Sequence, residues 1–151
     1  MSDSALKATI TSAMKESMRA RDKVRLGTIR LILSDIKRIE VDERIELDDV
    51  RVLAVLDKML KQRRDSISQY EAASRQDLAN VEVAEVAVIE MFLPTALTEQ
   101  EILELLDDAI SSSSADSIRD MGKVMAILKP QLQGKADVAS VSQLVKKRLS
   151  N

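Results

Sequence analysis

Apolar residues recur at the period of an α-helix along most of this chain. In the clearest stretch, Leu26, Ile29, Ile32, Leu33, Ile36 and Ile39 fall within one arc of about 140° at 100° per residue. Residues that interrupt helices are scarce, since only three Gly and two Pro occur among 151 residues. The pattern therefore predicts an all-α protein.

Capping residues and one proline predict four helices in the N-terminal part. The expected caps of the first three helices are Ser2 or Ser4, Asp22, and Asp48 or Asp49. The fourth helix is expected from about Gln76 to Met91, because Pro94 disfavours a helical residue before it. These four helices form an expected N-terminal helical domain of residues 1–95.

Three more helices are expected after the proline. Thr98 and Glu101 have the spacing of a capping box, so a helix should begin there. The low-complexity run Ser111 to Ser114 is expected to be a loop. Ser117 and Asp137 are expected to cap the last two helices, and Gly134 suits a left-handed position between them. Residues 96–151 are therefore expected to form a C-terminal three-helix domain.

The composition argues against a catalytic centre. Without Cys or His, the chain lacks thiolate nucleophiles, disulfides and the commonest general base and metal ligand. The three glycines are isolated, so no phosphate-binding loop exists. The one dense carboxylate cluster, Asp77, Glu82, Glu85 and Glu90, has no nearby His and is interpreted as a solvated acidic face. We predict no catalytic residues, metal or cofactor, and no enzyme activity of the chain by itself.

Charged residues also bear on location and partners. Residues 1–20 mix charges among the apolar positions, so they lack the apolar core of a signal peptide, and no stretch approaches a membrane span. We therefore predict a cytoplasmic protein without membrane contact. Residues 1–64 carry 15 basic and 11 acidic side chains, residues 65–108 carry 1 and 11, and residues 109–151 carry 7 and 3. The two basic ends could face an anionic partner or could be ordinary solvated helix faces.

Two basic segments have different expected roles. The run Lys61 to Arg64 has acidic residues four positions away, such as Asp57 and Asp65, and is interpreted first as a salt-bridged solvent face. The C-terminal segment carries seven cations: Arg119, Lys123, Lys129, Lys135, Lys146, Lys147 and Arg148. Phosphate binding needs such a field of positive charge. Because aromatic stacking residues are absent there, recognition of a nucleic-acid backbone or shape is favoured over reading of single-stranded bases.

One glycine in this segment needs a separate explanation. Gly122 falls inside an expected helix, where it costs about 0.5–1 kcal/mol relative to alanine. Tight packing against the final helix is the first interpretation. Close approach of a bound backbone is the second.

The longest motifs resemble the GatB/YqeY family. They are RLGTIRLILSDIKRIEVDER from Arg25, KQRRDSISQYEAASRQDLANVEVAEVAVIEMFLPTALTEQEI from Lys61, and DMGKVMAILKPQLQGKADVASVSQLVKKRL from Asp120. Together they cover nearly the whole chain and are most similar to the stand-alone members of the family. The resemblance implies an N-terminal helical domain followed by a three-helix domain. The same module forms the tail of the B subunit of the glutamine-dependent aminoacyl-tRNA amidotransferase, where it helps engage tRNA.

This resemblance implies a non-catalytic tRNA- or RNA-associated helper, acting with the amidotransferase or a tRNA-charging complex. The family label of carbon–nitrogen ligase with glutamine as amido donor belongs to domains and subunits that this chain lacks. The positions that the resemblance assigns to nucleic-acid binding are Lys123, Lys129, Lys135, Lys146 and Lys147. Two alternatives remain open: a helical protein–protein interaction module, and an accessory part of the amide-transferring ligase itself.

Overall fold

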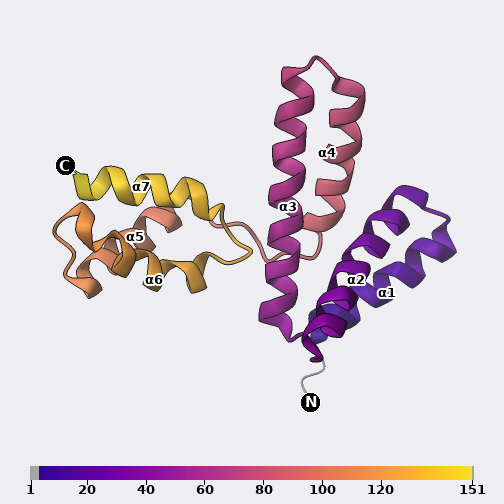
Figure 1. The fold of residues 1–151 in the computed structure, drawn as a ribbon, viewed down its shortest axis with the longest axis horizontal. Coiled ribbons are helices and arrows are strands. Elements are labelled where there is room, and N and C mark those ends of the chain that lie inside the picture. The colour runs from indigo at the N-terminus through magenta and orange to yellow at the C-terminus, as the bar shows by residue number, and fades with distance from the viewer. Residues whose placement is uncertain (1–3, 151) are drawn as a thin grey trace. The chain divides into compact units, whose positions relative to one another are not determined.

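The computed structural model describes residues 4–150, and all its regular elements are helical (Figure 1). The first four helices are α1 (Ala5–Ala20), α2 (Lys23–Glu43), α3 (Asp49–Ala72) and α4 (Gln76–Glu90). They are followed by α5 (Glu99–Ser113), the 3-10 turn η1 (Ile118–Asp120), α6 (Met121–Leu132) and α7 (Val138–Ser150). No strand occurs within the described residues, so the prediction of an all-α protein is confirmed. The chain divides into two compact units, Met1–Leu93 and Pro94–Asn151.

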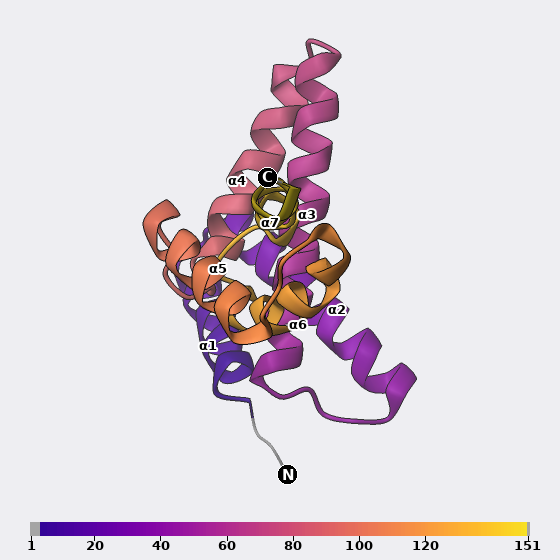
Figure 2. The same cartoon turned by 90° about the vertical axis from the view of Figure 1, so that its left-hand side faces the viewer.

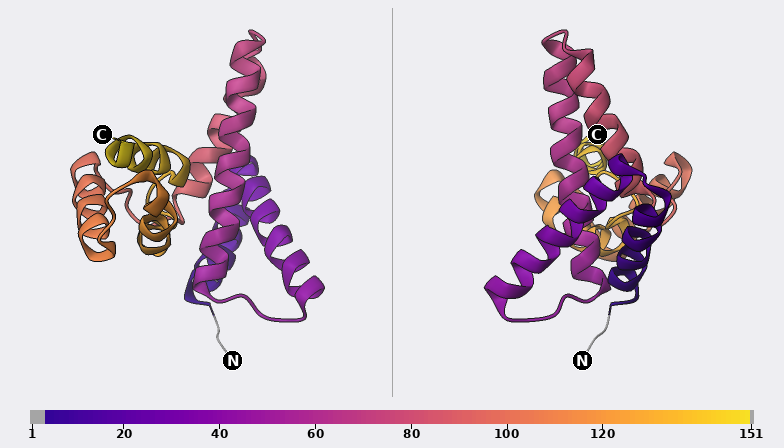
Figure 3. Two further views of the ribbon diagram at one scale, coloured as in Figure 1. Left: turned by 60° about the vertical axis from the view of Figure 1, so that its left-hand side comes forward. Right: turned by 90° about the vertical axis from the view of Figure 1, so that its right-hand side faces the viewer.

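The N-terminal unit is built around the helical stripe that the sequence shows most clearly. Ile29, Ile32 and Ile36 of α2 are fully buried, and they share one core with Ile10 of α1 and Ile89 of α4. The helices α3 and α4 run side by side as an antiparallel hairpin (Figure 2). One end of this hairpin packs with α1 and α2, while the other end extends beyond them (Figure 3). The buried face of α2 therefore holds the unit together.

Three of the predicted caps in this unit form as expected. Ser4 accepts a hydrogen bond from the Lys7 amide at 3.0 Å, and Asp22 and Asp48 cap α2 and α3 in the same way. The alternative cap Ser2 lies outside the described residues. Helix α4 begins differently, because Arg75 at its N-cap makes no side-chain capping bond.

Helical spacing predicts a core face of α3 formed by Leu53, Leu56, Leu60, Ile67 and Tyr70, and the structure buries a different set. The buried residues of α3 are Val52, Val55, Leu56, Met59 and Leu60. Leu53 is only partly buried, and Ile67 and Tyr70 are partly exposed. The reason is that α3 has α1, α2 and α4 as neighbours, so its first half is covered on more than one side.

The C-terminal unit has its own core. Leu106 of α5, Val124 and Leu128 of α6 and Val145 of α7 are at most 1% exposed within it. The predicted cap forms, since the Thr98 hydroxyl accepts from the Glu101 amide at 3.2 Å, but the Glu101 carboxylate accepts from the Thr98 hydroxyl at 3.0 Å and not from the Thr98 amide. These contacts fix the beginning of α5.

Two details of this unit correct the predictions. Ser111 to Ser113 are not a loop: they continue α5, which ends only at Ser114 with a left-handed φ of 55°. Serine is a poor helix former but not a breaker, and the buried Ala109 just before this run is already part of the core. Ser117 makes no capping bond and precedes the turn η1, so α6 begins later than expected, at Met121.

No helix in the described part of the chain has the length and apolar character that crossing a membrane requires.

Candidate functional site

The candidate site lies on α6 and α7, which run antiparallel as a hairpin (Figure 1). The inner faces of α6 and α7 are both apolar, and they belong to one core. Gly134 lets the chain turn between them, because its φ of 74° is left-handed. Asp137 then begins α7 by accepting hydrogen bonds from the Ala139 amide at 3.2 Å and the Ser140 hydroxyl at 2.9 Å. The predicted turn and cap are both confirmed.

All five predicted lysines lie on the solvent side of this hairpin. Lys123, Lys129, Lys135, Lys146 and Lys147 are exposed. Lys129 is six positions after Lys123 on α6, which is about 9 Å along a helix. Lys135 lies in the segment between the two helices, and Lys146 and Lys147 lie on α7. Both helices and their connection therefore carry positive charge.

Most of this charge is not neutralised within the unit. Lys123 is 3.7 Å from the carboxylate of Asp120, and Arg148 is paired with Asp107 of α5. The pKa of Asp120 lies below its ordinary value, chiefly because the Asp116 amide donates a hydrogen bond to it. Lys129, Lys135, Lys146 and Lys147 form no salt bridge among residues 4–150. Four ammonium groups are therefore available to an anion in solvent.

The first interpretation of Gly122 was wrong. A β-carbon built on Gly122 would meet nothing within 4 Å, so the final helix does not pack closely against it. Gly122 is exposed and follows η1 in the first turn of α6. The alternative, close approach of a bound backbone, stays a prediction.

The basic run on α3 differs from the C-terminal lysines, because two of its side chains form ion pairs with α4. Arg63 donates to Glu85 at 2.8 Å, and Arg64 lies 3.6 Å from Glu90. Both acidic partners are on α4, whereas the sequence spacing pointed to acids on α3 itself. Among the described residues, no group of acidic side chains is arranged to hold a metal ion. Glu85 and Glu90 of α4 thus form ion pairs with α3. The sequence had predicted only a solvated acidic face.

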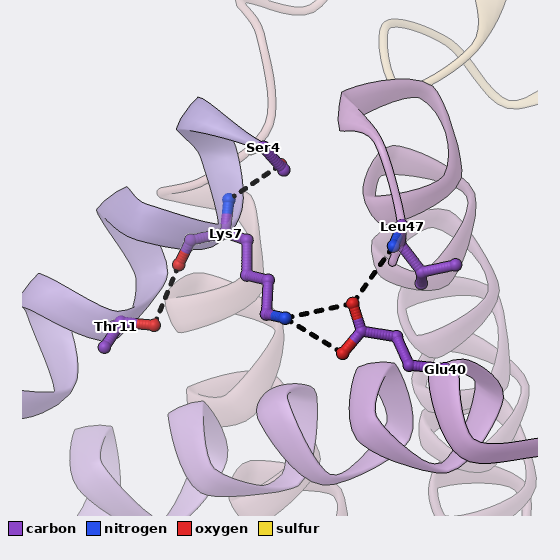
Figure 4. A network of polar contacts seen from close by, with 5 residues as sticks. All are labelled: Ser4, Lys7, Thr11, Glu40 and Leu47. Atoms are coloured by element: carbon purple, nitrogen blue, oxygen red, sulfur yellow. Dashed lines mark hydrogen bonds and ion pairs between the residues drawn. The ribbon is translucent and has the colours of Figure 1, made fainter. Parts of the chain in front are cut away.

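A polar network at the base of the N-terminal unit was not predicted (Figure 4). The Glu40 carboxylate is 8% exposed, and each of its oxygens accepts from the Lys7 ammonium at 2.9 Å. It also accepts from the Leu47 amide at 3.0 Å, in the segment between α2 and α3. The hydrogen bond from Lys7 lowers the pKa of Glu40 most, while burial opposes this effect. Glu40 therefore joins α1, α2 and the segment that leads into α3, a structural role that helical spacing alone does not reveal.

Comparison with known proteins finds several fungal relatives. A protein of Kluyveromyces lactis named "Altered inheritance of mitochondria protein 41, mitochondrial" is 31% identical over 125 residues, which cover 78% of this chain and 68% of that protein. Proteins of the same name from Vanderwaltozyma polyspora and Clavispora lusitaniae are 37% and 34% identical over 81 and 115 residues. These matches cover 53% and 74% of this chain, and 44% and 66% of those proteins. Part of each relative therefore lies outside the match.

These names contradict the prediction of a cytoplasmic location, because they place the relatives in mitochondria. The prediction rested on the absence of apolar segments in the sequence. Proteins directed to mitochondria share that absence, because transit peptides are amphipathic, so it could not single out the cytoplasm.

The resemblance drawn from the sequence motifs is confirmed independently of these relatives. The family described as Yqey-like protein matches residues 7–149. This range includes the stripe of α2, the α3–α4 hairpin and all five exposed lysines of the candidate site. The chain therefore belongs to the family of Yqey-like proteins.

Proposed function

We propose that this protein is a non-catalytic, tRNA-associated helper that holds RNA through the phosphates facing Lys123, Lys129, Lys135, Lys146 and Lys147. The observation that carries the proposal is the exposed, largely unpaired positive charge of the α6–α7 hairpin. Ammonium groups that lack an internal partner can replace the counterions of a phosphate backbone at little cost.

The resemblance to the tail domain of the amidotransferase B subunit supports tRNA as the nucleic acid. A tRNA is a folded RNA, and phosphate and shape recognition suits such a target. The proposed partners are tRNA and a complex that handles charged tRNA, such as the amidotransferase. Direct participation in amide transfer is a weaker candidate, because no nucleophile–base pair is present in the sequence. The purified chain is expected to release no ammonia from glutamine above a buffer control.

We also propose that the two compact units are independent domains, four helices followed by three. Each unit has a separate hydrophobic core, which supports independent folding. Limited proteolysis should then cleave first between Leu93 and Thr98, a segment outside the helices. First cleavage inside α2 would contradict this division.

Binding of tRNA to the full chain tests the main proposal. The test variant replaces Lys123, Lys129, Lys146 and Lys147 by Gln, and it should bind tRNA at least about tenfold more weakly at low salt. The matched control replaces the same number of exposed cations of the N-terminal unit, Lys15, Arg19, Lys58 and Lys61, by Gln. Equal weakening by both variants would reveal only a general effect of net charge, and would contradict the assignment of the C-terminal lysines.

A further inference from the structure

The outer face of α2 carries an apolar stripe that no other helix of the N-terminal unit covers. Val24, Leu31 and Val41 lie opposite the buried isoleucines of the same helix and are 59%, 49% and 61% exposed. With Gly27, Ser34 and Arg38 between them, they follow the alternating spacing of three and four residues that one helix presents to another. Isolated exposed apolar residues are common, so these three count as evidence only together with the other features of the same helix face.

Gly27 lies within this stripe and supports the same view. A β-carbon built on Gly27 would meet nothing within 4 Å, so no contact inside the protein requires glycine there. Glycine in a helix interior weakens that helix relative to alanine. Its absent side chain does, however, allow a second helix to approach closely at this point.

One edge of the stripe is entirely basic. Lys23, Arg30 and Lys37 are spaced by seven residues and follow the stripe along α2, and Arg44 comes directly after the helix ends. All four are exposed, and none is in a salt bridge within the part of the chain that the structure describes. The other edge is acidic: Asp35 lies 3.9 Å from Arg38, and Asp42 is exposed. The two edges of the stripe therefore differ in the sign of their charge, and the basic edge is unpaired.

We propose that the outer face of α2 docks an amphipathic helix of a partner protein, whose apolar face covers Val24, Leu31 and Val41 and whose acidic edge lies along the basic row. The row supplies charge complementarity, and the stripe supplies apolar area. A phosphate backbone would use the basic row but would leave the apolar residues in water. The stripe therefore favours a helix over a nucleic acid.

A second copy of this chain fits the face less well. In an antiparallel pair of α2 helices the two basic edges would face each other. In a parallel pair Arg30 and Lys37 would face Asp35 and Asp42 of the other copy, but Arg38 would meet its own equivalent in the apolar seam. Both arrangements place like charges together, which an acidic partner helix avoids.

The experiment uses the full chain and two designed helical peptides of 21 residues, the length of α2. Both peptides carry Leu along one face, and the flanking positions are Glu in one peptide and Lys in the other. Fluorescence anisotropy should show saturable binding of the Glu peptide, and binding of the Lys peptide at least about tenfold weaker. No binding of the Glu peptide, or equal binding of both, would overturn the proposal.

Three variants locate the surface, and circular dichroism checks that each is folded. Reversal of Lys23, Arg30 and Lys37 to Glu should exchange the peptide preference, so that the Lys peptide binds more tightly. Reversal of Lys15, Arg19 and Lys58 to Glu, which changes the net charge equally, should leave the preference intact. Leu31→Asn should weaken the Glu peptide without exchanging the preference.

Two other results would replace a partner helix by another occupant. If sedimentation shows a dimer of the wild-type chain that Leu31→Asn dissociates, a second copy covers the stripe. tRNA binding is measured with Leu31→Asn and with the variant in which Lys23, Arg30 and Lys37 are Glu. If both weaken tRNA binding as much as they weaken peptide binding, the outer face of α2 belongs to the nucleic-acid site. Either result overturns the docking proposal.

Discussion

The basic side chains of α3 and those of the α6–α7 hairpin have similar sequence density but different surroundings. Arg63 and Arg64 each have a carboxylate partner on α4, at 2.8 and 3.6 Å. Lys129, Lys146 and Lys147 have no such partner within residues 4–150. The first group stabilises a helix hairpin, whereas the second leaves its charge for something outside the chain. A basic run is thus a candidate binding surface only when the fold does not already neutralise it.

The largest expected effect comes from a core substitution that separates the two units. Leu128 is fully buried in the C-terminal core, so Leu128→Ala should lower the free energy of unfolding of that unit by about 2–5 kcal/mol. The single tyrosine, Tyr70, lies in α3, and the chain has no tryptophan. If the units fold independently, Leu128→Ala shifts part of the circular dichroism transition but leaves the Tyr70 fluorescence transition unchanged.

The reciprocal control is Ile32→Ala, which removes a fully buried side chain from the N-terminal core. It should shift the Tyr70 transition and leave the C-terminal part of the circular dichroism transition in place. If either substitution moves both transitions together, the two units unfold as one and the proposed division is wrong.

A smaller effect on the free energy of unfolding is expected from loss of the partly buried ion pair between Glu40 and Lys7. Glu40→Gln removes the charge that accepts two bonds from Lys7, and should lower the free energy of unfolding by about 1–3 kcal/mol at neutral pH. The folded pKa of Glu40 is lowered from its ordinary 4.5, so its contribution is present above pH 4.5 and is lost as the pH falls through the folded value. Urea unfolding of both proteins across this range should show the difference shrinking toward low pH. A difference that stays constant would show that the network does not depend on ionised Glu40.

The smallest expected effect has the opposite sign. Gly27→Ala and Gly122→Ala place a methyl group in open space on α2 and α6, and each should raise the free energy of unfolding by up to about 0.5–1 kcal/mol. Thermal unfolding of the two single variants measures this directly. A loss of stability in either variant would mean that a neighbouring group occupies the space beside that glycine.

Features that depend on the sequence of one helix alone, such as its N-cap, could be predicted. Asp22, Thr98 and Asp137 cap their helices as expected because a cap depends only on residues one turn away. The serine run at the end of α5 misled the prediction, since its helical state depends on continuation from a packed helix. In this segment tertiary contacts of α5 determine the helical state more than the helix propensity of serine does.

Interactions between helices could not be predicted from spacing. Glu40 meets Lys7 across 33 residues and Arg63 meets Glu85 across 22, distances along the chain at which no periodic pattern points to a partner. The candidate lysines could be chosen from motif and charge alone because exposed side chains need no partner in the fold. What the sequence left open was which basic residues the fold would neutralise.

We propose that the exposed C-terminal lysines hold RNA through its phosphates. Fluorescence anisotropy of labelled tRNA at three or more salt concentrations tests it most directly. Each contacted phosphate should contribute about 0.7 to 0.9 log units of affinity per decade of salt, so four lysines give a slope near −3. Replacing Lys123, Lys129, Lys146 and Lys147 by Gln should flatten this slope with helical content unchanged. Absence of binding at low salt, or a slope that the four substitutions leave unaltered, would contradict the account.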